Sequence, residues 1–116
     1  MAALALGAGF AAGADTGRPA TVTGWVLDSA CAFTKGLTKP ISRECALACA
    51  KAGSPLVILA SDGTIYWPIA DSMPAAGQNS RLEPYAGKQV TASGKAYKRA
   101  GSTALVIEKI QEAPAK

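Results

Sequence analysis

Three cysteines are the residues of this chain whose type and spacing could do chemistry. Cys31, Cys45 and Cys49 lie within one 26-residue stretch, 28–53, of a 116-residue chain that contains no histidine. Without histidine the chain lacks the usual general base and the commonest metal ligand, so the thiols are the strongest candidates for a functional site. An odd number of cysteines allows one disulfide with a spare thiol, or three thiolates on one metal ion.

A disulfide is the interpretation that the spacing favours. Cys45 and Cys49 are one turn apart on a predicted helix, where their Cβ atoms point in nearly parallel directions, so they are poorly placed to bridge each other. A bridge from Cys31 to that helix is easier, and we expect it to join Cys31 to Cys49 and to leave Cys45 at the helix start. Closing a loop of about 15 residues would stabilise a small domain by about 3 kcal/mol in the chain-entropy model.

A metal-thiolate site is the alternative. Two thiolates at helical positions i and i+4, with a third on a preceding turn, can converge on one ion, and soft sulfur ligands select Cu(I) or Zn(II). Zinc requires a fourth ligand, for which only Asp28, Glu44 or water could serve, whereas trigonal Cu(I) needs none. Met73 could also approach such an ion. The disulfide interpretation implies no cofactor, and this alternative implies copper or zinc.

The elements next to the cysteines follow from local signals. Residues 21–27 are β-branched and aromatic, which predicts a strand. Asp28 and Ser29 end this strand in a tight turn that presents Cys31, and residues 33–40 are expected to form a loop.

A helix is predicted over residues 43–52, with Ser42 as its N-cap and Gly53 just beyond its end. One narrow face of this helix carries only small side chains, which should let it approach the sheet closely. The residues of that face are Cys45, Ala48, Cys49 and Ala52.

The rest of the chain predicts a β scaffold. Apolar or alternating runs indicate four more strands, and a short helical segment precedes the last two. The strands are 55–60, 64–69, 88–98 and 103–110, and the helical segment is 80–86. This order predicts a mainly β fold: a small five-stranded OB-like barrel with the cysteine-bearing helix inserted after strand 1 and a short helix between strands 3 and 4. An open five-stranded sheet packed on the cysteine helix is the alternative.

Two compositional features bear on packing. Gly24 and Gly94 fall in the middle of strands, where a small barrel would bend, and Gly24 also suggests a bulge or a close backbone approach. Apolar residues make up 49% of the chain, but many of them are alanines, so we expect a core of small side chains.

Four motifs of the chain occur together. They are Gly24-Trp-Val-Leu-Asp28-Ser29-Ala-Cys31, Glu44-Cys45-(x3)-Cys49, Asp62-Gly63-(x2)-Tyr66 and Tyr85-Ala86-Gly87-Lys88-Gln-Val90-Thr91-Ala-Ser-Gly94. Together they resemble a set of small exported bacterial proteins that are OB-like and mostly uncharacterised. The resemblance spans most of residues 22–110 and implies the fold and export. Relatives of this kind often carry a histidine four residues after the first cysteine, where this chain has Lys35, so the Cys/His/Cys/Cys metal site that they suggest would lack one ligand here.

The first 14 residues predict export. They are uncharged and mostly apolar, they end in Ala12-Gly13-Ala14, and they fit part of a secretory signal that is cleaved after small residues. A membrane span needs about 20 apolar residues, which this segment does not supply. We therefore expect a signal peptide at 1–14 and a single mature domain at 15–116, located in the periplasm or outside the cell, where disulfides persist.

A basic cluster near the last predicted turn is the other candidate site. It lies in a loop that many OB barrels use for ligands, and Tyr66 and Trp67 could add stacking for an oligosaccharide or a nucleic acid. The favoured interpretation is a solvated hairpin tip, and the modest net charge of +4 gives no reason to expect nucleic acid as a partner. The cluster consists of Lys95, Tyr97, Lys98 and Arg99.

No pattern in the chain indicates catalysis. Its carboxylates are scattered over separate turns, and no Gly-x-Ser-x-Gly motif is present. The sequence therefore predicts an exported, non-catalytic binding or structural module of the cell envelope, with an unknown small ligand or envelope component as its partner.

Overall fold

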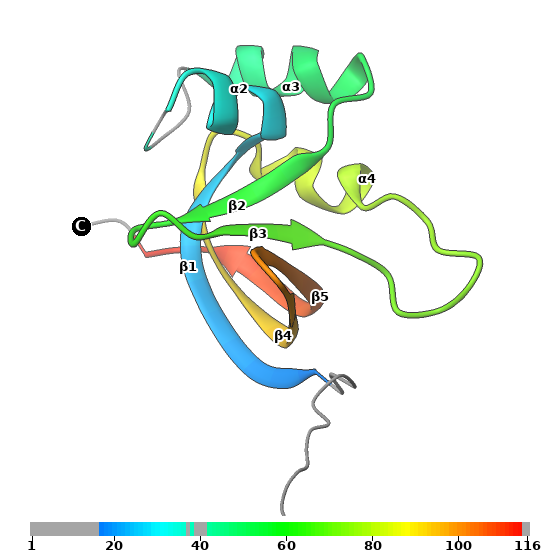
Figure 1. Ribbon diagram of the computed structural model, residues 1–116. Helices are drawn as coiled ribbons and strands as arrows, with labels where there is room; N and C mark the ends of the chain where they lie inside the picture. Colours follow the sequence, from blue (N-terminus) through cyan, green and yellow to red (C-terminus); the bar gives the residue numbers. More distant parts are fainter. Residues whose placement is uncertain (1–16, 37, 39–41, 115–116) are drawn as a thin grey trace, which may run out of the picture.

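Five strands close on one another to form the body of the protein (Figure 1). The computed structural model describes residues 17–36, 38 and 42–114, so the predicted leader at 1–14 lies outside the described residues. Around the barrel the strands follow the order β1-β2-β3-β5-β4, and β4 pairs in turn with β1. The predicted OB-like barrel is thereby confirmed. The strands are β1 (Arg18–Asp28), β2 (Leu56–Ala60), β3 (Ile65–Pro68), β4 (Gln89–Arg99) and β5 (Ser102–Glu112).

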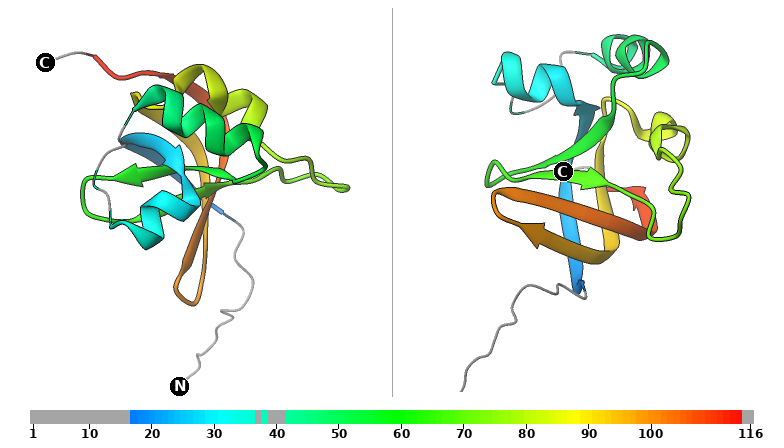
Figure 2. Two further views of the ribbon diagram at one scale, coloured as in Figure 1. Left: turned by 90° about the horizontal axis from the view of Figure 1, so that it is seen from above. Right: turned by 45° about the vertical axis from the view of Figure 1, so that its right-hand side comes forward.

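Short helices occupy two of the connections. The helix α3 (Arg43–Lys51) follows β1, and α4 (Asn79–Leu82) with the 3₁₀ turn η2 (Glu83–Tyr85) separates β3 from β4, both as predicted. A further helix, α2 (Ser29–Thr34), replaces the predicted turn and the start of the predicted loop. Figure 2 shows α2 and α3 side by side at one end of the barrel. No helix in the described part of the chain is long and apolar enough to cross a membrane.

The first strand closes the barrel because it pairs on both of its edges. It is antiparallel to β4 from Arg18 to Trp25 and antiparallel to β2 from Gly24 to Asp28. Where the two pairings overlap, a Cβ atom on Gly24 would lie only 2.5 Å from the carbonyl oxygen of Leu59. The expectation that this mid-strand glycine permits a close backbone approach is therefore correct.

The interior of the barrel is filled mainly by branched aliphatic side chains. Leu82 of α4 is fully buried among them and covers part of the barrel interior. The expectation of a core of small side chains is wrong for the barrel, because strands supply β-branched and leucine side chains at alternate positions. Alanine side chains instead form the buried face of α3. The larger core residues are Val22, Val26, Leu56, Ile58, Leu82, Val90, Leu105 and Ile107.

The second mid-strand glycine yields a stability test. Gly94 sits at a register shift between β4 and β5, and a Cβ atom there would collide with the carbonyl of Val106. We expect Gly94→Ala to lower the free energy of unfolding by about 1–3 kcal/mol, the usual cost of overpacking, in a denaturant titration. Gly101→Ala is the matched control, because nothing lies within 4 Å of its Cβ position. Equal stability of the two variants would contradict the predicted collision at the register shift.

Candidate metal centre

The helix that carries two of the cysteines is anchored at both ends. At its start, the Arg43 guanidinium donates to the carbonyl oxygens of Ala86 at 2.9 Å and Pro84 at 3.2 Å. Beyond its end, the Asn79 side chain donates to the carbonyl oxygen of Ser54 at 2.9 Å and accepts from the amide of Leu56 at 2.8 Å. These contacts fix the start of α3 to the segment before β4, and the chain just beyond its end to α4. Nothing in the sequence alone marked Arg43 or Asn79 as supports of the site.

Cys31 and Cys45 occupy the same position in two different helices. Asp28 is the N-cap of α2 and accepts a hydrogen bond from the amide of Cys31, and Ser42 is the N-cap of α3 and accepts one from the amide of Cys45. Each cysteine is thus the third residue of its helix, behind a capping side chain. The Ser42 cap was predicted. The same spacing, Asp-x-x-Cys, is the signal that could have revealed α2.

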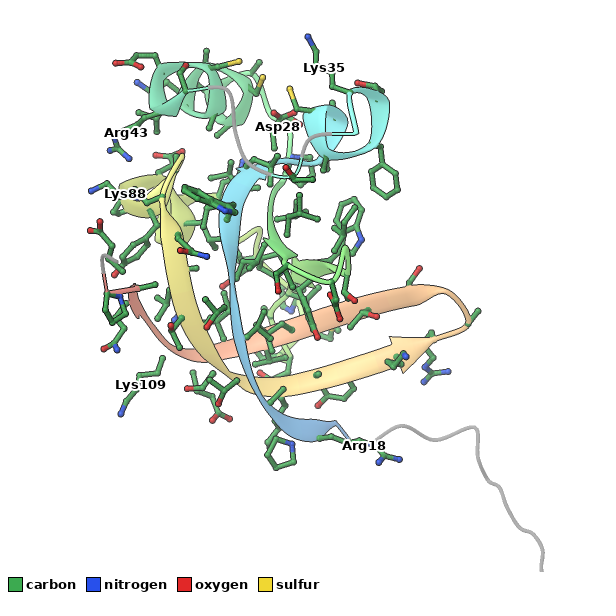
Figure 3. All side chains as sticks on the ribbon, turned by 90° about the vertical axis from the view of Figure 1, so that its left-hand side faces the viewer. Arg18, Asp28, Lys35, Arg43, Lys88 and Lys109 are labelled. Atoms are coloured by element: carbon green, nitrogen blue, oxygen red, sulfur yellow. The ribbon has the colours of Figure 1, made fainter. Side chains whose placement is uncertain are left out.

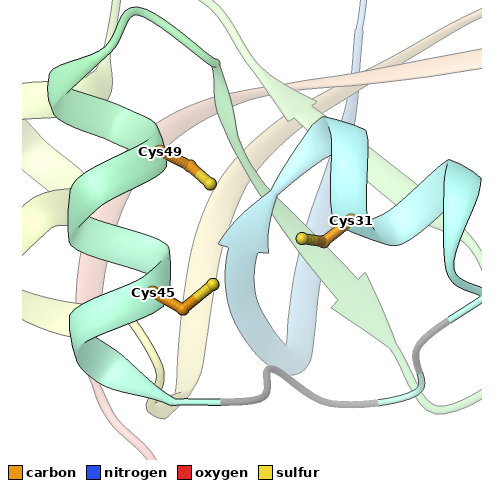
Figure 4. A group of neighbouring side chains, drawn as sticks. All are labelled: Cys31, Cys45 and Cys49. Atoms are coloured by element: carbon orange, nitrogen blue, oxygen red, sulfur yellow. The ribbon is translucent and has the colours of Figure 1, made fainter.

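The three thiols converge on one point (Figure 4). Their Sγ atoms lie within 4.8 Å of one another, and all three residues are partly buried free cysteines. Three thiolates on one ion with metal–sulfur bonds of about 2.3 Å would stand about 4 Å apart, so only small side-chain rotations separate this arrangement from a ligand set.

The orientation of α3 decides this convergence and differs from the predicted one. The expectation that Cys45, Ala48 and Cys49 share the face packed on the sheet is wrong, because Ala46 and Ala50 are the buried residues and Ala48 is exposed. Ala46 and Ala50 are also one turn apart and equally small, so the helix can rest on them instead. That rotation turns both sulfurs sideways, toward α2.

A buried carboxylate lies beside the thiols. Asp28 is 1% exposed, and its Oδ2 atom accepts from the amide of Cys31 and from the hydroxyl of Ser54, each at 3.2 Å. Burial alone would raise the pKa of Asp28, but hydrogen bonds from these groups and from the Cys31 and Cys49 thiols outweigh it, so the pKa lies below its usual value. The sequence predicted a turn at Asp28 and offered this residue as a possible fourth ligand of zinc, but it did not indicate that the carboxylate is buried.

The same carboxylate affects the thiols in the opposite direction. Its hydrogen bond to the thiol, followed by burial and by its negative charge, raises the pKa of Cys31 to about 11. Burial, with the charge of Asp28 next in importance, also raises the pKa of Cys49. Without a metal ion, these two thiols are therefore held in their protonated form at neutral pH.

The other candidate ligands do not belong to the group of converging sulfurs. The group of mutually close ligand atoms found among the described residues holds the three cysteines but no carboxylate, so neither Asp28 nor Glu44 is in place as a fourth ligand. Glu44 is exposed, and so is Lys35, which ends α2. Met73 is 81% exposed, on the segment between β3 and α4 that extends beyond the side of the barrel in Figure 1.

The structure splits the predicted basic cluster. All four residues lie on β4, where successive side chains point to opposite faces, so Lys98 faces away from Lys95, Tyr97 and Arg99. Lys98 lines a surface hollow together with Phe33 and Trp67, whose ring centroids are 6.1 Å apart. Tyr66 does not line this hollow, so of the two predicted stacking residues only Trp67 does.

Comparison of the chain with models of protein families, with curated proteins and with solved structures finds no match. The resemblance to small exported OB-like proteins therefore stays a prediction, and arguments about function depend on the residues themselves.

The raised pKa of Cys31 predicts slow alkylation in the metal-free, reduced protein. Thiolates are the reactive form, and a pKa of about 11 instead of 9.0 leaves about 100-fold less thiolate at pH 8. We expect iodoacetamide to modify Cys31 at pH 8 about 100-fold more slowly in the folded protein than in urea, as measured by mass spectrometry of its peptide. In the folded protein the rate should rise about tenfold for each pH unit up to the pKa. Equal rates in both states at pH 8 would show that the thiol is not held in its protonated form.

Proposed function

We propose that this protein is a non-catalytic metal-thiolate protein that binds one soft metal ion through Cys31, Cys45 and Cys49. The observation that carries the proposal is the convergence of three sulfurs within 4.8 Å of one another. A single disulfide requires only two of them to meet.

The way in which the sulfurs are brought together supports a ligand set. Cys31 comes from α2 and the other two from α3, and these helices each pack on the barrel strands. Separate N-caps fix the amides of Cys31 and Cys45, and α3 is tied at both ends. Ligands on rigid, independently anchored elements favour metal binding, because fewer side chains have to be immobilised when the ion binds.

The donor set narrows the choice of metal. Thiolates select Cu(I) and Zn(II) over hard cations such as Mg²⁺ and Ca²⁺. Cu(I) is satisfied by three sulfurs in a trigonal arrangement, whereas Zn(II) in a three-thiolate site would complete its tetrahedron with water. Cys45 and Cys49 are only partly buried, so water can reach the site as that fourth ligand. The predicted export would make this a metal-binding protein of the cell envelope.

A disulfide-stapled binding module is the second candidate function. The same proximity of Cys31 and Cys49 that suits a metal also suits their oxidation, and an oxidising compartment would favour it. In that case the barrel and its helices would form a structural or binding domain, with Cys45 as a spare thiol.

Thiol counting and elemental analysis separate the two candidates. Protein purified without reductant should contain one zinc or copper ion per chain and should release three reactive thiols only when a chelator is added to the unfolded chain. A count of one thiol without metal would instead establish the disulfide. Metal far below one ion per chain, in protein with three free thiols that takes up neither Zn(II) nor Cu(I), would overturn the metal proposal.

Single substitutions identify the ligands. We expect Cys31→Ser, Cys45→Ser and Cys49→Ser each to weaken Zn(II) binding by more than the about 10–100-fold that follows the loss of an outer-sphere partner, in a competition titration with a chromophoric chelator. Met73→Leu is the sulfur-containing control and should bind as the wild type does. Free Zn(II) at a concentration of 100 times its Kd should also raise the free energy of unfolding of the wild type by about 2.7 kcal/mol. A variant lacking Cys45 that bound normally would reduce the site to two cysteines.

A further inference from the structure

Asp28 is the single charged residue that is buried in the described part of the chain. It is the last residue of β1, and Figure 3 shows it at the end of the barrel that faces the sulfur atoms. Burying a carboxylate is costly unless hydrogen bonds compensate it, so its position calls for a reason beyond ending a strand.

The contacts of this carboxylate link α2 to the segment that ends α3. On the α2 side, Oδ2 accepts from the amide of Cys31 at 3.2 Å. On the other side, Oδ2 accepts from the hydroxyl of Ser54 at 3.2 Å, three residues beyond the end of α3. The backbone amide of Ser54 also donates to the carbonyl oxygen of Cys49 at 3.0 Å. One side chain therefore connects the backbone of Cys31 to the backbone of Cys49 through Ser54.

The other capping residue does not have this reach. Ser42 accepts from the amide of Cys45 at 3.0 Å, a contact within α3 and its own cap, so it orients Cys45 without linking it to Cys31. The two caps thus form a natural comparison, since both hold a cysteine amide but only Asp28 spans the site.

We propose that Asp28 is the positioning residue of the three-cysteine site. It sets Cys31 against Cys49 through the cap of α2 and the hydroxyl of Ser54, and it does not bind the ion. This inference rests on the proposed metal-thiolate function. A carboxylate that hydrogen-bonds to metal ligands without binding the ion orients those ligands. Fewer side-chain conformations are then lost when the metal binds.

Spectroscopy with Co(II) separates positioning from a general effect on folding. Each thiolate bound to Co(II) contributes to the sulfur-to-metal charge-transfer absorption. We expect Asp28→Ala to weaken Co(II) binding by about 10–100-fold and to lose the share of that absorption that Cys31 contributes. Asp28→Asn keeps an oxygen that can accept from the Cys31 amide, so it should retain the three-thiolate spectrum and bind more tightly than the alanine variant. Ser54→Ala should weaken binding less than Asp28→Ala.

Two controls accompany these variants. Asp62→Ala removes an aspartate that accepts from the Thr64 amide in an exposed turn, and Ser42→Ala removes the cap of α3. Asp62→Ala should leave both affinity and spectrum unchanged. A wild-type affinity and spectrum in Asp28→Ala, in a protein that still unfolds cooperatively, would overturn the inference. If Asp28→Ala does not fold, a wild-type affinity in Ser54→Ala would overturn it. A shift of the d–d bands in Asp28→Asn at unchanged charge-transfer intensity would also overturn it, because Asp28 would then be a ligand.

A crosslinking experiment tests Asp28 without any metal. Dibromobimane links two neighbouring thiols and fluoresces once both of its arms have reacted, and peptide mass spectrometry identifies the linked pair. In the reduced, metal-free wild type we expect links between Cys31 and Cys49. Asp28→Ala should lower the share of the modified Cys31 that is linked to Cys49, while links between Cys45 and Cys49 persist. An unchanged share of linked Cys31 would overturn the positioning role. If the wild type binds no metal, only the proposed function fails, and the crosslinks still decide the role of Asp28.

Discussion

The double pairing of β1 is the constraint on which the rest of the structure depends. This strand hydrogen-bonds to β4 along its first part and to β2 along its last part, and the change occurs at Gly24, where any side chain would strike the backbone of Leu59. Because the strand is shared, the barrel closes without a free edge between β2 and β4. It also means that β1 ends at a fixed place beside the start of β2. Asp28 is the last residue of that strand, so barrel closure positions the carboxylate that caps α2.

The candidate site is built from two short helices whose positions depend on their contacts with the barrel. Neither α2, with six residues, nor α3, with nine, is long enough to be stable in isolation. Each is held by a cap and by contacts to the strands, and Arg43 and Asn79 add side-chain hydrogen bonds to neighbouring carbonyls. Three thiols on such supports form a compact soft-ligand set. A buried acceptor, Asp28, raises the pKa of two of them, so in the proposed function a metal ion would have to displace their protons.

The structural features that were correctly predicted are those that depend on local sequence. Alternating and apolar runs located all five strands, Ser42 and the small-residue stretch after it located α3, and Gly24 marked a close backbone approach. The prediction of a tight turn at Asp28 was wrong because Asp favours both turns and helix N-caps, and six residues give too weak a periodicity to distinguish the two. The predicted packing face of α3 was wrong for a related reason. Its alanines and cysteines are all small, so several faces could lie on the sheet equally well.

The sequence by itself determined the fold class and the kind of chemistry that is available. Strand periodicity is a local property, and a chain with three cysteines, two methionines and no histidine can offer a metal ion only sulfur atoms as soft ligands. The tertiary structure alone decided that the three sulfurs meet and that Asp28 is buried beside them. Both outcomes depend on the rotation of α3 about its axis and on where β1 ends relative to β2, and these are set by contacts between residues far apart in the chain.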